Sequence, residues 1–542
     1  MCTDGFLVIQ LLGNIYDTSN TQNQRIGAFI MGVKFPSSLL NKIWHYSEVP
    51  QTAVSLRQMC QFGSHPTPGL MFKASCFLLN ELPVRLAHRI KELESLPREL
   101  NKVEEVITVR DWYTQSFQEL YEFCHDESQN HGAIYQSLFY GSKTANVDSL
   151  AKMLFTQEEM ETMKQAQNAK NSLYCKHKKF VDDGIVMKIP GPQSHTSSQP
   201  INTNGLVPLP QKYFSPLPAS TVKEWSKSQD FYQFWPADLL LFNRSFYNVL
   251  QRIKERHDAT VITLAKGVLK WKKTHQQNVV DDSIQSFLDR FYLSRIGIRM
   301  LIGQHLALLE SARQPAQEPM DEDDENWVGI ICTKTNITQL AKSAIDNARH
   351  ICADHYGLYE APKVQLLTFP LDYRPSTEGT TSCTNEAPDI EFMYVPGHLI
   401  HMLFETLKNS LRATVEKVIA KNKSKDRYDL TFPDIKVIIT EGTEDLTVKI
   451  SDEGGGIARS NMPLVWTYLY TTMPEDEQIG LMSEELSQNF RIPMAGYGYG
   501  LALSRLYARY FGGDLKLMSM EGFGTDVYLH LNRLSTSSEP LQ

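Results

Sequence analysis

One stretch of the sequence decides the fold: His401-Met-Leu-Phe-Glu405-Thr-Leu-Lys408-Asn409-Ser-Leu-Arg412. Apolar residues recur here at four-residue spacing, which predicts an amphipathic helix with one apolar stripe, formed by Leu403, Leu407, Leu411 and Val415. At about 100° per residue, Glu405, Asn409 and Arg412 lie about 200° from that stripe. The helix therefore presents a carboxylate, an amide and a guanidinium on its opposite face.

That polar face has the chemistry for phosphate transfer. A carboxylate can polarise a hydroxyl group or a water molecule, and an amide oxygen is a hard ligand suited to Mg²⁺. A guanidinium suits phosphate. The alternative for this helix taken alone is an ordinary solvated polar face.

Three glycine-rich stretches follow this helix: Ser451-Asp452-Glu-Gly454-Gly-Gly456, Gly496-Tyr-Gly498-Tyr-Gly500-Leu501 and Gly522-Phe-Gly524-Thr525. Glycine lets the backbone turn sharply and approach a ligand closely. The second stretch runs into a predicted helix, and the N–H groups at a helix N-terminus form a ready anion site. Each stretch alone also fits a plain turn, loop or hairpin.

The joint order of these elements is more specific than any one of them. ExxxN, DxGxG, GxGxG and GxGT follow one another between Glu405 and Thr525. A Walker A loop is absent from the sequence, and so are the HRD and DFG motifs of eukaryotic-type kinases. The ordered set resembles the GHKL superfamily of ATP-binding domains, which includes histidine kinases, type II topoisomerases and mitochondrial dehydrogenase kinases.

Longer segments narrow the resemblance to one family. The pyruvate dehydrogenase kinase family looks similar in residues 50–59, 81–87, 287–305, 394–416, 496–511 and 519–526. The resemblance extends over about residues 38–163, 221–310 and 327–533. The sister family, the branched-chain 2-oxoacid dehydrogenase kinases, shares many of these segments, including one like residues 328–333.

The resemblance implies an ATP-dependent protein serine kinase that uses Mg²⁺. Its expected substrate is the alpha subunit of the pyruvate decarboxylase component, whose phosphorylation stops conversion of pyruvate to acetyl-CoA. The family fold is an N-terminal four-helix bundle followed by a Bergerat-type α/β sandwich that binds ATP. A homodimer in the mitochondrial matrix is expected, with the lipoyl domain of the acetyltransferase component as a partner. The sequence lacks a tryptophan after Trp466, so the tail exchange between family protomers is not implied.

The resemblance also implies roles for individual residues. Glu405 would be the general base, flanked by His401 and Lys408, and Asn409 would hold Mg²⁺. Arg412 would lie by the phosphates. Asp452 and Thr525 would recognise adenine. The pocket would be shaped by Gly454, Gly456, Gly496, Gly498, Gly500 and Leu501. In the helical part, His257 of Arg256-His257-Asp258 matches a family segment near the active site, although a buried structural histidine fits equally well.

Composition bounds the class of protein. The chain has 542 residues, which suggests two to four domains. A formal net charge of −8 disfavours a broad nucleic-acid-binding face. No run approaches the roughly 18 apolar residues of a membrane span, and eight cysteines without a CxxC pair favour a reducing compartment. The first residues carry no clear targeting signal.

The pattern changes along the chain. Residues 38–315 predict a helical domain with helices at 77–90, 112–123, 231–273 and 282–310; Pro83 should kink or break the first, and the third should break near His257. Proline-rich residues 165–220 predict a flexible insertion, and 316–326 an acidic linker. Residues 1–37 are unassigned, 327–535 form the ATP-binding domain and 536–542 a tail.

Residues 327–535 alternate between strand and helix patterns. Strands are expected at 328–332, 363–367, 435–439, 446–450, 515–520 and 526–531, and helices at 337–355, 397–421 and 501–511. This mixture predicts an α/β sandwich. Three alternatives to a pyruvate dehydrogenase kinase stay open: a branched-chain dehydrogenase kinase, a protein-histidine kinase, and a catalytically silent scaffold that binds the dehydrogenase complex.

Overall fold

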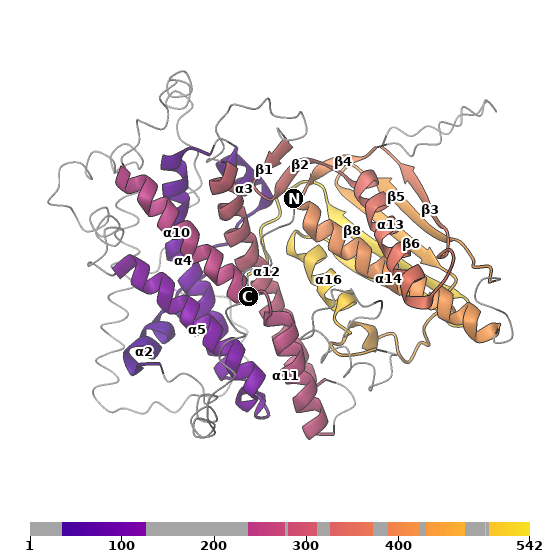
Figure 1. The fold of residues 1–542 in the computed structure, drawn as a ribbon, viewed down its shortest axis with the longest axis horizontal. Coiled ribbons are helices and arrows are strands. Elements are labelled where there is room, and N and C mark those ends of the chain that lie inside the picture. The colour runs from indigo at the N-terminus through magenta and orange to yellow at the C-terminus, as the bar shows by residue number, and fades with distance from the viewer. Residues whose placement is uncertain are drawn as a thin grey trace, which may run out of the picture.

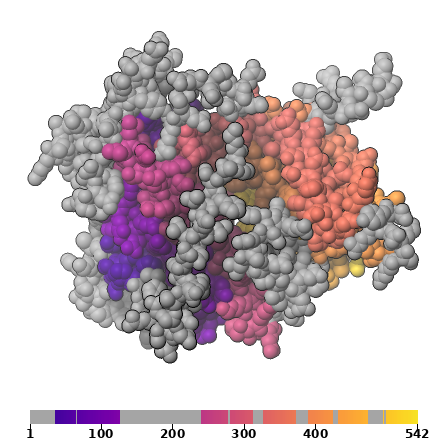
Figure 2. Space-filling model, in the orientation of Figure 1, coloured from indigo at the N-terminus to yellow at the C-terminus, as the bar shows by residue number. Residues whose placement is uncertain are grey.

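The computed structural model describes residues 35–64, 66–125, 237–276, 280–311, 326–371, 389–422, 430–471, 494 and 498–541. A helical part and a sheet-containing part lie side by side (Figures 1 and 2), and helix α16 stands where they meet (Figure 1). The predicted domain bounds stay a prediction. The insertion at 165–220, most of the acidic linker and the first 34 residues lie outside the described residues.

Long amphipathic helices build the first part. Their bounds are α2 Ser37–Tyr46, α3 Leu56–Gly63, α4 Pro68–Glu94, η1 Leu100–Lys102, α5 Glu104–His125, α10 Ala237–Arg256, α11 Thr260–Thr274 and α12 Asp282–Ser311. The predicted break near His257 falls between α10 and α11. The apolar face predicted for the last helix is buried throughout α12. Because residues 126–236 lie outside the described part, the four-helix bundle stays a prediction.

Pro83 does not break the helix that contains it. Helix α4 is continuous from Pro68 to Glu94. A proline inside a helix removes one hydrogen bond and costs about 3 kcal/mol. Most side chains of α4 are buried on both sides of Pro83, so tertiary packing offsets that cost and keeps the helix intact.

A five-stranded sheet in the order β3-β5-β6-β8-β7 carries the second part. The strands are β3 Val364–Phe369, β5 Ile435–Glu441, β6 Asp445–Asp452, β7 Asp514–Met520 and β8 Gly524–Asn532. One face is covered by α13 Ile337–Tyr356, α14 Pro396–Lys421 and α16 Gly500–Tyr510 (Figure 1). Side chains along β6 alternate between buried and half-exposed, as one covered face requires. The α/β fold is confirmed.

The strand predicted at 328–332 is wrong as a single strand. The structure has a hairpin instead, in which β1 Trp327–Val328 pairs with β2 Ile331–Asn336. Gly329 turns the chain at φ +64°, and Gln304 of α12 holds the turn through Val328 O and Ile330 N, both at 2.9 Å. Strand β4 Glu391–Tyr394, which the pattern missed, completes this small sheet.

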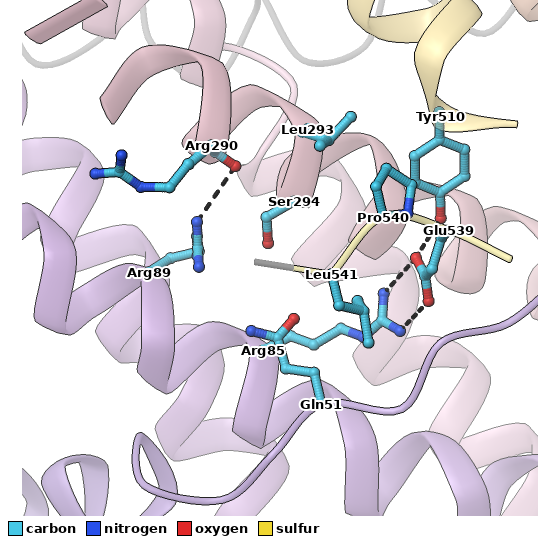
Figure 3. Close-up of a pocket in the computed structure, with 10 residues that line it drawn as sticks. All are labelled: Gln51, Arg85, Arg89, Arg290, Leu293, Ser294, Tyr510, Glu539, Pro540 and Leu541. Carbon is cyan, nitrogen blue, oxygen red and sulfur yellow. Dashed lines mark hydrogen bonds and ion pairs between the residues drawn. The ribbon is translucent and has the colours of Figure 1, made fainter. Parts of the chain in front are cut away.

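The C-terminal segment returns to the helical part. Glu539 N donates a hydrogen bond to Val54 O, and Val54 N donates one to the side-chain Oε1 of Glu539, both at 3.2 Å. The Glu539 carboxylate lies between the Arg85 guanidinium and the Tyr510 hydroxyl (Figure 3), with Arg85 Nη1 at 3.0 Å and Tyr510 Oη at 2.5 Å. Glu81 Oε1 accepts from Arg85 Nε at 2.8 Å. A buried ion cluster therefore ties the two parts together.

None of the helices in the described ranges is long and apolar enough to cross a membrane.

Candidate active site

Helix α14 presents the predicted catalytic face. Pro396 occupies its first turn, where a missing N–H costs no hydrogen bond. The apolar stripe is buried, with Leu403, Leu407, Leu411 and Val415 at most 1% exposed. Glu405 is half-buried, and Asn409 one turn later is exposed. The predicted helix and its two faces are confirmed.

Glu405 and Lys408 form an ion pair on this face. Lys408 Nζ lies 2.9 Å from Glu405 Oε1, and the exposed fractions of the two side chains are 4% and 16%. Such shielding from water strengthens the attraction. His401 precedes Glu405 by one turn, with its ring 5.1 Å from that of Tyr507. Burial lowers the pKa of His401 despite the neighbouring Glu405 carboxylate, so its imidazole is neutral at pH 7.

Asp452 and Thr525 meet across two strands. The register of β6 and β8 places them opposite each other. Asp452 Oδ1 accepts hydrogen bonds from Gly454 N at 2.9 Å and Thr525 N at 3.3 Å. Burial raises the pKa of the Asp452 carboxyl, while these N–H donors and the Ser410 hydroxyl oppose the rise. The two residues expected to contact adenine thus lie together.

The first and last glycine bends are joined to each other. Gly455 N donates to Phe523 O at 3.0 Å, and Gly522 N donates to Gly455 O at 2.7 Å. Gly456 has φ +71°, and a Cβ there would lie 2.0 Å from Met520 O. A Cβ at Gly454 would lie 2.5 Å from that of Ala413 on α14. Only glycine allows these bends to pack against α14 so closely.

The second glycine stretch lies against Glu405. A Cβ at Gly500 would lie 2.3 Å from Glu405 Oε2. Gly498 has φ +77°, and its Cβ would lie 2.6 Å from Tyr470 O. Leu501 is half-buried in the first turn of α16. Gly496 lies outside the described residues. All three glycine stretches therefore lie against α14, the helix that carries Glu405 and Asn409.

Comparison with known proteins identifies relatives that bind or use ATP. A sequence profile described as mitochondrial branched-chain alpha-ketoacid dehydrogenase kinase matches residues 53–332. A second profile, of histidine kinase-, DNA gyrase B- and HSP90-like ATPases, matches residues 394–535. A mitochondrial pyruvate dehydrogenase (acetyl-transferring) kinase of Schizosaccharomyces pombe is 38% identical over 510 residues, covering 93% of this chain and 99% of that protein.

The chain belongs to the pyruvate dehydrogenase kinase family.

Two further members of the pyruvate dehydrogenase kinase family are similar over a comparable and a shorter span. The mitochondrial kinase of Arabidopsis thaliana is 34% identical and covers 94% of this chain and 97% of its own length. Human isozyme 3 is 39% identical over 297 residues, 54% of this chain and 64% of that protein.

Two predicted residues of this family member lie apart from Glu405. Arg412 lies two turns beyond Glu405 on α14, and its Nε donates to Glu416 Oε1 at 2.7 Å. His257 lies in the helical part, 2% exposed, where it stacks on Tyr113 at 4.4 Å and bonds Ser116 Oγ at 3.0 Å. Burial, reinforced by Arg295, lowers its pKa to about 3. This packing matches the structural alternative, and a catalytic role for His257 stays a prediction.

Sequence reasoning missed Lys417. Its Nζ donates to Glu453 O at 2.7 Å and to Phe523 O at 3.0 Å, so it joins both glycine bends to α14. The signal was present, because residue 417 continues the four-residue spacing of Glu405 and Asn409. A lysine at the end of that spacing fits a clamp on backbone carbonyls.

Proposed function

We propose that this chain is an ATP-dependent protein serine kinase that phosphorylates and inactivates the alpha subunit of the pyruvate dehydrogenase component. One observation carries this proposal: Glu405, Asn409 and the glycine bends meet on α14 in a chain of this family. Phosphoryl transfer asks mainly for positioning and charge neutralisation. The half-buried carboxylate and the N-terminus of α16 beside it can supply both.

Glu405 would accept the serine proton. Lys408 holds one of its oxygens, which leaves Oε2 on the side of Gly500. A base needs to be within hydrogen-bond reach of the proton it removes. His401, neutral and one turn away, would flank the reacting hydroxyl.

Asn409 fits a Mg²⁺ ligand. Its exposed side chain makes no hydrogen bond with any residue of the described ranges, so its amide oxygen is free to bind an ion. Bound Mg²⁺ would neutralise charge on the phosphates of ATP. Asp452 and Thr525 would recognise adenine from the opposite end of the pocket. We expect Asn409→Ala to lose Mg²⁺-dependent nucleotide binding, measured by nucleotide titration with and without Mg²⁺.

A side-by-side phosphorylation assay tests the substrate. Purified pyruvate and branched-chain decarboxylase components are incubated separately with the protein and γ-labelled ATP. We expect acid-stable label on a serine of the pyruvate component. Label on the branched-chain component alone would overturn the substrate assignment. Acid-labile label would point to a histidine kinase, and no label on either would favour the silent scaffold.

The lipoyl domain of the acetyltransferase component is the proposed docking partner. The helical part contains a narrow apolar cavity of about 50 Å³, lined in part by Met59, Phe62, Phe77 and Leu301. This volume is far smaller than a lipoyl arm, so the cavity does not support the docking proposal, which rests on membership of the family alone. Calorimetric titration with lipoylated and unlipoylated domain tests this partner: tighter binding of the lipoylated form would support it, and no binding of either form would overturn it.

A homodimer in the mitochondrial matrix completes the proposal. The face of the five-stranded sheet opposite the helices carries exposed apolar side chains on β3 and β7, among them Leu367, Met518 and Met520. Pairing two such faces would remove this apolar area from water. Sedimentation should give twice the chain mass, and Met518→Lys should shift it towards the monomer.

A further inference from the structure

A side-chain clasp joins α12 to the segment that follows the first glycine bend. Gln285 Nε2 donates to Trp466 O, and Tyr468 N donates to Gln285 Oε1, both at 3.1 Å. One turn along α12, Asp289 Oδ1 accepts from Tyr468 Oη at 2.7 Å. Three hydrogen bonds from the helical part therefore fix one short segment of the nucleotide-binding part.

Three buried tyrosines extend this clasp to α16. Tyr292, Tyr468 and Tyr499 are at most 5% exposed. Their ring centroids lie 5.4 Å apart for Tyr292 and Tyr468, and 5.9 Å apart for Tyr292 and Tyr499. The rings of Tyr468 and Tyr499 are 5.0 Å apart. Each ring thus contacts the other two, and Tyr499 directly precedes Gly500.

The contacts continue to the candidate base. Gly498 packs on Tyr470 O, and Gly500 packs on Glu405 Oε2, each too closely for a side chain. Tyr499 provides no side-chain cap for α16, and its ring packs against those of Tyr292 and Tyr468. A displacement of Tyr468 would therefore pass through Tyr499 to Gly500 and to the surroundings of Glu405.

We propose that Gln285 and Asp289 are positioning residues for phosphoryl transfer, which set the place of Gly500 relative to Glu405 from the helical part. This role presupposes the proposed function of the site. Misplacement of reacting groups by about 1 Å can cost about a hundredfold in rate. Directional hydrogen bonds restrict such movement more tightly than apolar contact does.

The choice of residue types supports a positioning role over plain packing. Burial raises the pKa of Asp289, so this position disfavours a charged carboxylate. Apolar residues of similar size usually serve stability as well as, or better than, buried polar groups. A carboxylate at this junction, bonded to Tyr468 Oη, fits a requirement for one fixed geometry.

Two pairs of variants test the clasp. Tyr468→Phe removes one hydroxyl and keeps the ring. Asp289→Leu removes the acceptor, whereas Asp289→Asn keeps an oxygen that can accept the Tyr468 hydrogen bond. Tyr247→Phe is the matched control, because Tyr247 Oη bonds Glu310 Oε1 of the same helix at 2.5 Å, about 30 Å further along α12 at about 1.5 Å per residue.

The readouts are the single-turnover rate of transfer to the pyruvate decarboxylase component, the nucleotide Kd and the unfolding midpoint. We expect Tyr468→Phe and Asp289→Leu to lower the rate about tenfold to a hundredfold, with a smaller change in Kd. Asp289→Asn and Tyr247→Phe should stay near wild type, and all midpoints should remain close. A purely structural role would move the midpoint and leave the rate of folded enzyme unchanged.

The outcomes separate this inference from the proposed function. Wild-type protein that transfers no phosphate would overturn the proposed function and the positioning role with it. Wild-type transfer with Tyr468→Phe and Asp289→Leu rates within about twofold of it would overturn the positioning role alone. An equal loss in Asp289→Asn and Asp289→Leu would also overturn it, because the retained acceptor would then make no difference.

Discussion

Two buried ion pairs in this kinase family member differ in what surrounds them. In the Arg85–Glu539 pair both side chains are at most 2% exposed, and Tyr510 and Val54 occupy the remaining capacity of the carboxylate. In the Lys408–Glu405 pair Glu405 is 16% exposed, and its Oε2 faces Gly500. A fully bonded carboxylate can only hold segments together, whereas one with a free oxygen can also accept a proton.

The sharpest test of that difference replaces Glu405 with its neutral isostere. Glu405→Gln keeps the shape but removes the base, so kcat should fall about 10²-fold to 10⁴-fold. Nucleotide affinity and the free energy of unfolding should change little. Stopped-time transfer assays and nucleotide titration measure the two quantities, and full activity in the variant would refute the base assignment.

The same replacement at Glu539 should lower the free energy of unfolding and leave kcat unchanged. Glu539→Gln leaves Arg85 buried with Glu81 as its remaining charged partner, and breaking a buried pair costs about 3–5 kcal/mol. We expect a loss of that order in the free energy of unfolding, measured in urea, with kcat per folded molecule preserved.

A surface pair provides the control for Glu539→Gln. Glu360, whose side chain is 73% exposed, pairs with Arg349 at 3.1 Å. Glu360→Gln should cost no more than about 1 kcal/mol, as exposed pairs do. Equal losses in the two variants would show that burial of the Arg85–Glu539 pair has no special weight.

Asp452 extends the comparison to a carboxylate held by backbone N–H groups and a hydroxyl. Asp452→Ala removes the acceptor proposed for the adenine amine, and a hydrogen bond to a charged group contributes about 1.5–3 kcal/mol. ATP affinity should therefore fall about 10-fold to 100-fold. Calorimetric titration measures it, and ATP binding of wild-type strength would exclude Asp452 from the site.

The sequence predicts the site better than it predicts the links between the two parts. Apolar spacing predicts the helix at 397–421. The glycine bends are predictable because a sharp turn or a close backbone approach locally requires glycine. The hairpin at Gly329 depends on Gln304, which is distant in sequence, and Pro83 is tolerated because of packing around it. Glu539 meets Arg85 across 454 positions, and no local pattern carries such a contact.

The pKa of a buried ionisable side chain depends on whether a charged partner lies beside it. Arg85 stays charged because Glu539 and Glu81 raise its pKa against the effect of burial. No carboxylate of the described residues pairs with His305, and burial lowers its pKa from 6.5 to about 3. Below pH 6.5, the pKa of histidine in the unfolded chain, the unfolded state binds a proton that the folded state does not. The stability that neutral His305 contributes is therefore present above pH 6.5 and is lost as pH falls towards 3.

Between about pH 7.5 and about pH 5.5, one such histidine should lower the free energy of unfolding by about 1.4 kcal/mol. Urea titrations at both values should show a smaller loss in His305→Gln than in wild type. Replacement of the exposed His350 by Gln should leave the loss unchanged, and an identical loss in all three proteins would show that His305 is protonated in the fold.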